Sequence, residues 1–209
     1  MEDMTLKSCR SFAEALASDA PTPGGGGASA LAGALAAAVG HIVGALTVGK
    51  KKYADVEDEI RELMKRGEEL QESLLDLVAQ DAEVVAPLAA AYGMPKDTEE
   101  QRAEKDRVME TCLHAACTVP MQIMEACCSV IDLAAVFAEK GSRLAVSDAG
   151  VSAVLAGAAL EGASLNVFIN TKSMKDRVTA AALEAKANGM LDVYTVRAAE
   201  VFRAVREAM

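Results

Sequence analysis

The sequence predicts an all-α protein, an antiparallel bundle of about six helices, two of them long, that assembles as an oligomer. Two long stretches place apolar residues three or four positions apart, which is the spacing of one face of a helix. No segment alternates apolar and polar residues as a half-buried strand does. Alanine supplies most of the 52% apolar share and aromatic residues only 3%. Side chains this small favour closely packed helices.

Length and charge narrow the class of protein further. The 209 residues show no break in composition that marks a linker, so we expect one domain over residues 1–209. A net charge of −10 disfavours nucleic acid and an anionic membrane surface as partners. The charged N-terminal segment is unlike a signal peptide. The five cysteines lack zinc-ligand spacing, so we expect no metal and interpret them as core side chains in a reducing, cytoplasmic setting.

The first elements are separated by a segment rich in proline and glycine. A short amphipathic helix is predicted to end near Ser18, and the prolines and glycines follow it. The stretch from Ala28 to Val48 has no charged residue and, as a helix, would span ~30 Å. That length also permits a membrane span, but the alanine- and glycine-rich composition and the lack of a second such stretch favour a central buried helix.

Two long apolar repeats predict the long helices. The first runs from Val56 to Leu88, and the second runs from Met109 to Phe137, with Pro120 either starting a new helix or kinking the existing one. Ser147 is predicted to cap the next helix, which extends to about Asn170, and a last helix runs from near Met174 to the end. These faces offer more apolar surface than one bundle covers, which predicts an oligomer.

Asp81 breaks the first apolar repeat. The spacing calls for an apolar residue at this position, with Leu77 and Val84 as its neighbours on the same face. A buried carboxylate costs several kcal/mol unless it is paired or neutralised. The residue is therefore either bonded to a cation or a helix N-terminus for structural reasons, or it is part of a functional site.

The four consecutive glycines at positions 24–27 need an explanation of their own, because each costs roughly 0.5–1 kcal/mol in chain entropy. One interpretation is that backbone N–H groups at the start of the following helix bind an anion. The other is a tight turn or a flexible connection. The segment matches neither a P-loop nor a dinucleotide-binding fingerprint.

The stretch from Ser147 to Asn170 places small and polar residues on one face of a helix. Asp148 at its start is expected to complement the helix dipole. Asn166 and Asn170, one turn apart, suit either a heteroaromatic ligand or a bridge between helices. Eighteen residues separate Asp148 from Asn166, or ~27 Å along an unbroken helix. The two side chains of one chain therefore cannot both contact one small reacting centre. Either the ligand is long, or the two residues belong to different ends or to different subunits.

Three segments together resemble the formimidoyltetrahydrofolate cyclodeaminase / methenyltetrahydrofolate cyclohydrolase family. They are PTPGGGGASALAGALAAAVGHIV with the following LTVGKKKY, DAEVVAPLAAAYGMPKDTEE, and SDAGVSAVLAGAALEGASLNVFIN. The resemblance covers nearly the whole chain in family order. Gly27 stands where a serine is common, which removes a possible hydroxyl from this segment, and Thr171 stands where a leucine is usual.

The resemblance implies an all-α homodimer or higher oligomer that acts on the one-carbon bridge of a tetrahydrofolate substrate, without a separate cofactor. A base would activate water in the hydrolysis, and an acid would protonate departing ammonia in the deamination. It implies two catalytic carboxylates, Asp81 and Asp148. The substrate would be bound by residues of the glycine segment and of the later helix, namely Gly24, Gly25, Gly26, Gly27, Ser147, Asn166 and Asn170. A non-catalytic folate- or anion-binding module and a helical scaffold are the alternatives.

Overall fold

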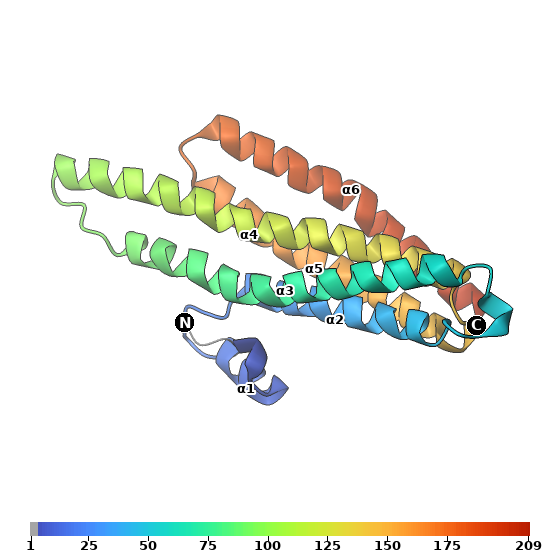
Figure 1. Cartoon of the computed structure of the whole chain (residues 1–209). Coiled ribbons are helices and arrows are strands. Elements are labelled where there is room, and N and C mark those ends of the chain that lie inside the picture. Colours follow the sequence, from blue (N-terminus) through green and yellow to red (C-terminus); the bar gives the residue numbers. More distant parts are fainter. Residues whose placement is uncertain (1–3) are drawn as a thin grey trace.

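The computed structural model describes residues 4–209, and this part of the chain consists of helices joined by short turns and loops, without a strand. Helices α2 to α6 lie side by side in an elongated bundle, and α1 projects from it close to the start of α2 (Figure 1). The six helices are α1 (Cys9–Leu16), α2 (Gly25–Ala45), α3 (Glu57–Tyr92), α4 (Glu99–Lys140), α5 (Val146–Ser173) and α6 (Arg177–Ala208). The predicted all-α bundle is confirmed, with α3 and α4 as the two longest helices at 36 and 42 residues.

Helix α5 lies at the centre of the arrangement and packs against α2, α4 and α6. It runs antiparallel to α2, because contacts pair low numbers in one helix with high numbers in the other. The hydroxyl of Ser152 donates to the carbonyl oxygen of Ala36 at 2.8 Å. At the opposite end, Gly25 lies beside the side chain of Asn166. The start of α2 is therefore adjacent to the C-terminal half of α5.

Two predicted helix boundaries were wrong. Helix α2 begins at Gly25 rather than near Ala28, so three of the four glycines form its first turn instead of a loop. Ser147 does not cap α5, because that helix begins one residue earlier and follows directly from a 3-10 turn, with Ala145 at the N-cap. A preceding turn already orders the backbone there, and no side-chain cap is present.

Pro120 lies inside α4 and does not start a new helix. A proline in a helix has no N–H, so the carbonyl four residues earlier loses its intrahelical partner. That carbonyl belongs to Ala116, and the side-chain amide of Asn170 in α5 donates to its oxygen at 3.1 Å. The hydrogen bond from α5 replaces the missing one, which explains how α4 continues through the proline for 42 residues.

Three helical stretches are strongly apolar, and many of their residues are buried inside the bundle. The helical stretches Gly25–Ala45, Glu99–Lys140 and Arg143–Ser173 are long and apolar enough to cross a membrane by length and composition alone, yet half or more of each apolar window is buried. Three of the cysteines, Cys117, Cys127 and Cys128, are buried in the core as predicted, and burial raises their thiol pKa values to about 11, 12 and 12. Cys9 is exposed, contrary to that interpretation.

Candidate active site

Asp81 lies on α3 with only 4% of its surface exposed, as its position in the apolar repeat predicts. Its Oδ2 atom accepts a hydrogen bond of 2.8 Å from the backbone N–H of Gly27, in the first turn of α2. Within residues 4–209 it forms no ion pair, so a buried cation partner is absent from this part of the chain, whereas the other structural alternative, a bond to a helix N-terminus, is what the structure shows. Asp81 is a buried carboxyl group held by a helix N-terminus.

The pKa of Asp81 reflects two opposing effects. Burial raises it above the ordinary value for an aspartate, because the charged form loses its hydration. The hydrogen bond from the Gly27 amide, at the positive end of α2, lowers the pKa of Asp81. This lowering is smaller than the rise caused by burial. A carboxyl group with a raised pKa both accepts and returns a proton more readily near neutral pH, as general acid–base chemistry requires.

Gly26 is the glycine that Asp81 requires. A Cβ atom built on Gly26 would lie 2.1 Å from Asp81 Oδ1, a distance that no real contact allows. The neighbouring positions are less restricted, since a Cβ at Gly25 or Gly27 would make ordinary contacts of 3.6 Å or more and one at Gly24 would touch nothing. The run of glycines therefore allows close approach of a carboxylate to the helix backbone.

Asn166 joins this site from α5. It is half-buried, and its amide lies 3.7–3.8 Å from the position that a Cβ of Gly25 would take. Its Nδ2 donates to the carbonyl oxygen of Gly162 at 3.1 Å, which fixes the side chain along its own helix. The carboxyl group of Asp81, the first turn of α2 and the amide of Asn166 thus come from three helices and meet at one place.

Ser29 also stabilises this arrangement, and sequence analysis did not identify it. Its hydroxyl donates to the carbonyl oxygen of Gly25 at 2.8 Å, and it is buried against Gly162, where a Cβ would come within 2.6 Å of the hydroxyl oxygen. The signal was the spacing, because Ser29 follows Gly25 by one turn and a serine there can bond back to the helix. The sequence alone does not show that Gly162 of α5 packs against this serine.

The other predicted site residues lie apart from Asp81 in the same chain. Asp148 is in the first turn of α5, ~27 Å from Asn166 along an unbroken helix. Ser147 is exposed beside it and lines an apolar groove of about 430 Å³ between α5 and α6. Asn170 is closer to the site, but its amide is bonded to α4 at Ala116, which favours the helix-bridging interpretation for this residue.

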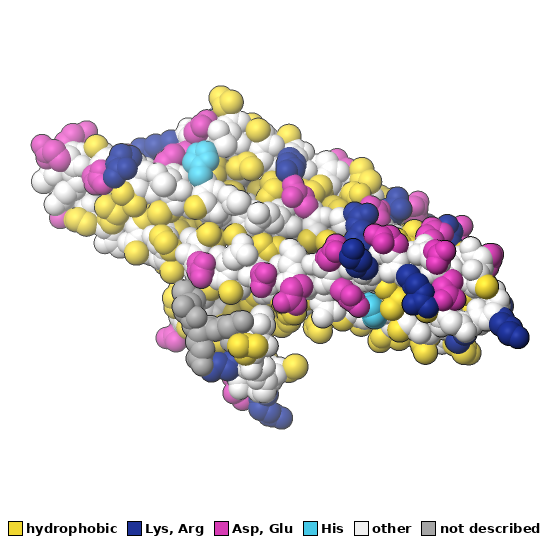
Figure 2. All heavy atoms as spheres, in the orientation of Figure 1, with side chains coloured by type: hydrophobic (Ala, Val, Ile, Leu, Met, Phe, Trp, Pro, Cys, Tyr) yellow, Lys and Arg dark blue, Asp and Glu magenta, His cyan; other side chains and the backbone are white. Residues whose placement is uncertain are grey.

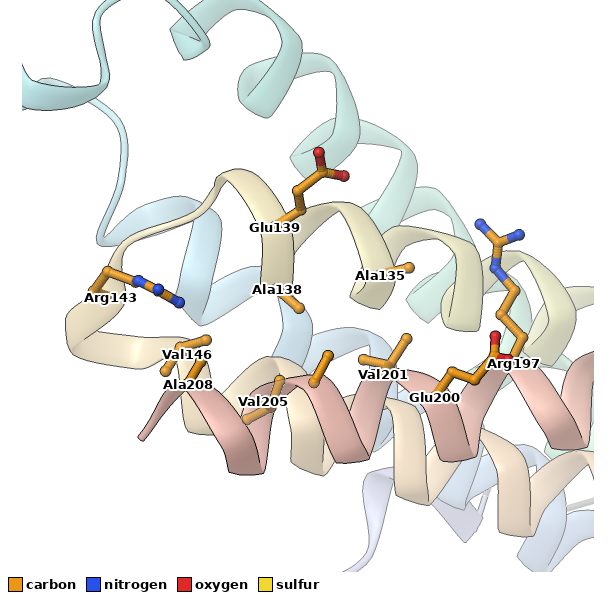
Figure 3. Close-up of a pocket in the computed structure, with 11 residues that line it drawn as sticks. Ala135, Ala138, Glu139, Arg143, Val146, Arg197, Glu200, Val201, Val205 and Ala208 are labelled. Carbon is orange, nitrogen blue, oxygen red and sulfur yellow. The ribbon is translucent and has the colours of Figure 1, made fainter.

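The bundle also has a hollow of about 570 Å³ among the ends of α4, α5 and α6, far along the chain from Asp81 (Figure 3). Figure 3 shows small apolar side chains such as Ala138 and Val201 lining it, with Glu139 and Arg197 pointing away from the α6 backbone. Arg197 is paired with Asp132 on α4, N–O distance 2.9 Å. This hollow contains no buried titratable group comparable to Asp81, so we place the candidate chemistry at the start of α2.

Comparison with known proteins identifies the family. The family model described as formiminotransferase-cyclodeaminase matches residues 8–189. The chain is 42% identical over 180 residues to the methenyltetrahydrofolate cyclohydrolase of Methylorubrum extorquens, covering 86% of each chain. The chain belongs to this family.

More distant relatives agree with this assignment. The formimidoyltransferase-cyclodeaminase of Rattus norvegicus is 30% identical over 171 residues, which is 82% of this chain but 32% of that longer protein. The crystal structure of formiminotetrahydrofolate cyclodeaminase from Thermotoga maritima superposes with a TM-score of 0.80 at 26% identity, covering 98% of this chain and 96% of that one. The family and the class of folate one-carbon enzyme predicted from the sequence are confirmed.

Proposed function

We propose that this enzyme hydrolyses methenyltetrahydrofolate, with Asp81 as the group that transfers the proton. The observation behind the proposal is the buried carboxyl group of Asp81 at the first turn of α2, beside Asn166, in a chain whose 42% identical relative of similar length is a cyclohydrolase. The substrate has a delocalised cation across N5 and N10, which a carboxylate stabilises. No cofactor is needed, because the reaction transfers only protons and water.

The reaction begins with attack of a water oxygen on the carbon between N5 and N10. Asp81, as the carboxylate, takes one proton from that water as the new C–O bond forms. The C–N5 bond then breaks and N5 receives that proton from Asp81, while the hydroxyl of the intermediate loses its proton to solvent as the formyl C=O forms. One water is consumed and one proton is released, and Asp81 ends in its starting state.

Substrate binding involves the residues around Asp81. Asn166 offers an amide suited to an edge of the pterin ring. The N–H of Gly27 already donates to Asp81 and is not available to a ligand. Of the four glycines, Gly24 and Gly25 are nearer the solvent and are therefore the ones that would bind an anion. They would hold a carboxylate of the glutamate tail at the start of α2.

Cyclodeamination of formiminotetrahydrofolate is the second candidate, favoured by the TM-score of 0.80 with the Thermotoga maritima cyclodeaminase. In that reaction N10 attacks the imino carbon and ammonia leaves after protonation. A carboxyl group with a raised pKa supplies that proton, so the same residue serves either reaction.

The purified wild-type enzyme is expected to hydrolyse methenyltetrahydrofolate at a rate well above the uncatalysed one and to leave the formimino compound unchanged. Loss of the methenyl absorbance and release of ammonia are measured in parallel, each against buffer without enzyme. Ammonia release without methenyl hydrolysis would assign the second reaction instead. Failure to bind either folate in a calorimetric titration would contradict the enzymatic proposal.

We also propose that the enzyme is a cytoplasmic homodimer joined through one surface, the α2/α5 face. It consists of large apolar side chains that are 43–67% exposed, namely Leu35 and Ile42 of α2, Leu46 at the C-cap of α2, and Val151, Leu165 and Ile169 of α5. Figure 2 shows hydrophobic side chains along the lower edge of the bundle, where α2 lies, and a row of acidic side chains over α3. An apolar surface with few charged residues is typical of an interface.

Replacing Leu35 by Arg is expected to convert the dimer to a monomer, because a charge in the middle of the α2/α5 face loses its hydration without gaining a partner. Light scattering measures the mass at micromolar concentration. The matched control is Val193→Arg, since Val193 is similarly exposed (57% against 53%) but lies on α6. A wild-type monomer would contradict the proposed dimer, and a dimer that survives Leu35→Arg but not Val193→Arg would place the interface elsewhere.

A further inference from the structure

We propose that Asn170 is a positioning residue of the active site, because its bond to α4 holds α5 at the axial position that places Asn166 beside the first turn of α2. Pro120 of α4 frees the acceptor of this bond. The inference rests on the proposed function, in which Asn166 binds the substrate. Asn170 therefore acts on the substrate through Asn166 and not by contact with it.

The first observation is the hydrogen bond between Asn170 and α4. The Nδ2 atom of Asn170 donates to the carbonyl oxygen of Ala116 at 3.1 Å, and Ala116 is buried. This carbonyl is available because residue 120 is a proline, which has no N–H to donate to it. A residue with an N–H at position 120 would satisfy the carbonyl within α4. The combination of Pro120 and Asn170 therefore produces a bond between two helices where a regular helix has none.

The second observation is that alanines line the buried side of α5. Each of the following is at most 2% exposed: Ala149, Ala153, Ala156, Ala159 and Ala163. Side chains that pack as ridges into grooves set the relative position of two helices, and a row of methyl groups forms only low ridges. Alanine packing thus restrains sliding of α5 along its neighbours less than large side chains would. Specific bonds to the neighbouring helices have to fix its axial position.

Two side-chain hydrogen bonds join α4 to α5 within residues 4–209. Besides the bond of Asn170, the thiol of Cys117 donates to the carbonyl oxygen of Val167, with 3.8 Å between sulfur and oxygen. Burial raises the pKa of this thiol to about 11, so it stays protonated at neutral pH, but a thiol is a weak donor. The amide of Asn170 therefore makes the stronger of the two bonds.

Asn170 acts on Asn166 through the helix that both residues share. They are four residues apart, ~6 Å along the axis, in a helix that continues from Val146 to Ser173. On the other side of Asn166, Gly162 packs closely against Ser29 of α2. Asn166 thus lies between a contact with α2 and a hydrogen bond to α4. A displacement of about 1 Å in a substrate-positioning group is enough to lower activity markedly.

Loss of the Asn170 bond is expected to affect substrate binding more than proton transfer. Asp81 belongs to α3 and its partner Gly27 to α2, so their hydrogen bond does not depend on how α5 is held against α4. Asn166 is the group of the site that belongs to α5. A shift of α5 therefore weakens a binding contact and leaves the proton-transferring group in place, which raises KM more than it lowers kcat.

Asn170→Leu tests this role, because leucine has nearly the size of asparagine but no donor. We expect the KM for methenyltetrahydrofolate to rise about tenfold and kcat to stay within about threefold of the wild-type value. Both are measured at a temperature at which circular dichroism shows the variant to be folded. The matched control is Asn188→Leu, since Asn188 is an exposed asparagine on α6, and it is expected to keep the wild-type KM.

The double variant Asn170→Leu with Pro120→Ala separates positioning from stability. Alanine at position 120 returns an N–H to the carbonyl of Ala116 within α4, so the melting temperature lost in Asn170→Leu is expected to recover. The KM is expected to stay raised, because α5 still lacks its bond to α4. Pro120→Ala alone is expected to keep the wild-type KM, since one carbonyl oxygen accepts both hydrogen bonds.

A wild-type KM in Asn170→Leu would overturn the proposal. So would a double variant in which the KM returns to the wild-type value together with the melting temperature, because the bond would then serve only to satisfy Ala116. If Asn170→Leu does not fold, the KM of the double variant decides between the two. A wild-type enzyme that neither binds nor converts a folate would reject the proposed function and this inference together, whereas failure of the inference alone leaves the wild-type activity intact.

Discussion

Replacing Asp81 by Asn is expected to lower the turnover of methenyltetrahydrofolate by about 10²–10⁴-fold, the usual contribution of a positioned acid–base group. Asparagine keeps the shape of the side chain and its oxygen still accepts the N–H of Gly27, so the site remains assembled. It does not exchange a proton near neutral pH, and that is the function removed. Steady-state rates measure kcat, and a calorimetric titration is expected to show that folate binding is largely retained.

The same substitution is expected to change how stability depends on pH. Burial raises the pKa of Asp81 in the folded protein above its unfolded value of 3.8. The group therefore favours folding below pH 3.8, and this contribution is lost as the pH rises through the folded pKa. Asparagine has no such dependence. The melting temperature of Asp81→Asn relative to the wild type should rise across that interval and stay higher above it.

Asp76→Asn is the matched control, because Asp76 is an exposed aspartate on the same helix. It is expected to keep the wild-type rate. An Asp81→Asn enzyme with normal turnover would end the catalytic assignment. A variant destabilised at neutral pH would show instead that the charged form of Asp81 stabilises the fold.

The fold was predictable because each long helix of the bundle leaves its own periodic signal. The spacing from Val56 to Leu88 required α3, and the same spacing exposed Asp81 as the exception on its buried face. A buried position follows from one helix alone. The identity of its partner does not, because Gly27 is 54 residues away along the chain and only tertiary packing brings it to 2.8 Å.

The errors at the ends of helices have the same origin. Four consecutive glycines have low helix propensity, so local reasoning assigns them to a loop. Packing against Asp81 and α5 outweighs that propensity and begins α2 at Gly25. Similarly, Pro120 predicts a break that Asn170 prevents from another helix. Where the structure departs from the sequence pattern, a residue distant in sequence supplies the missing interaction.

Asp148 shows what could not be predicted about the site from the sequence. Its chemistry and its position at the start of α5 were visible in the sequence. Its distance from Asn166 left open whether the ligand is long or the two residues belong to different ends or different subunits. The structure confirms that α5 is unbroken between them, which removes a bend in the helix as an explanation. The periodicity of one chain does not show what Asp148 contacts at its end of α5.

Replacing Gly26 by Ala is expected to reduce turnover almost as much as the loss of Asp81 itself. The added Cβ would lie 2.1 Å from Asp81 Oδ1 and 2.5 Å from its Cγ, so the carboxyl group must move away from the first turn of α2. The hydrogen bond to Gly27 and the position of the proton-transferring oxygen are then lost together. We expect a fall in kcat of about 10²-fold or more, measured with methenyltetrahydrofolate.

Two comparisons separate this effect from a general effect of alanine. Gly189→Ala on α6, where a Cβ would touch nothing within 4 Å, is expected to keep full activity and to gain up to about 1 kcal/mol of stability from helix propensity. The double variant Asp81→Asn with Gly26→Ala is expected to be no slower than Asp81→Asn alone, because the alanine acts on catalysis through that carboxyl group. If the two losses instead multiply, Gly26 has a second task, such as direct contact between its backbone and the substrate, and the steric explanation is insufficient.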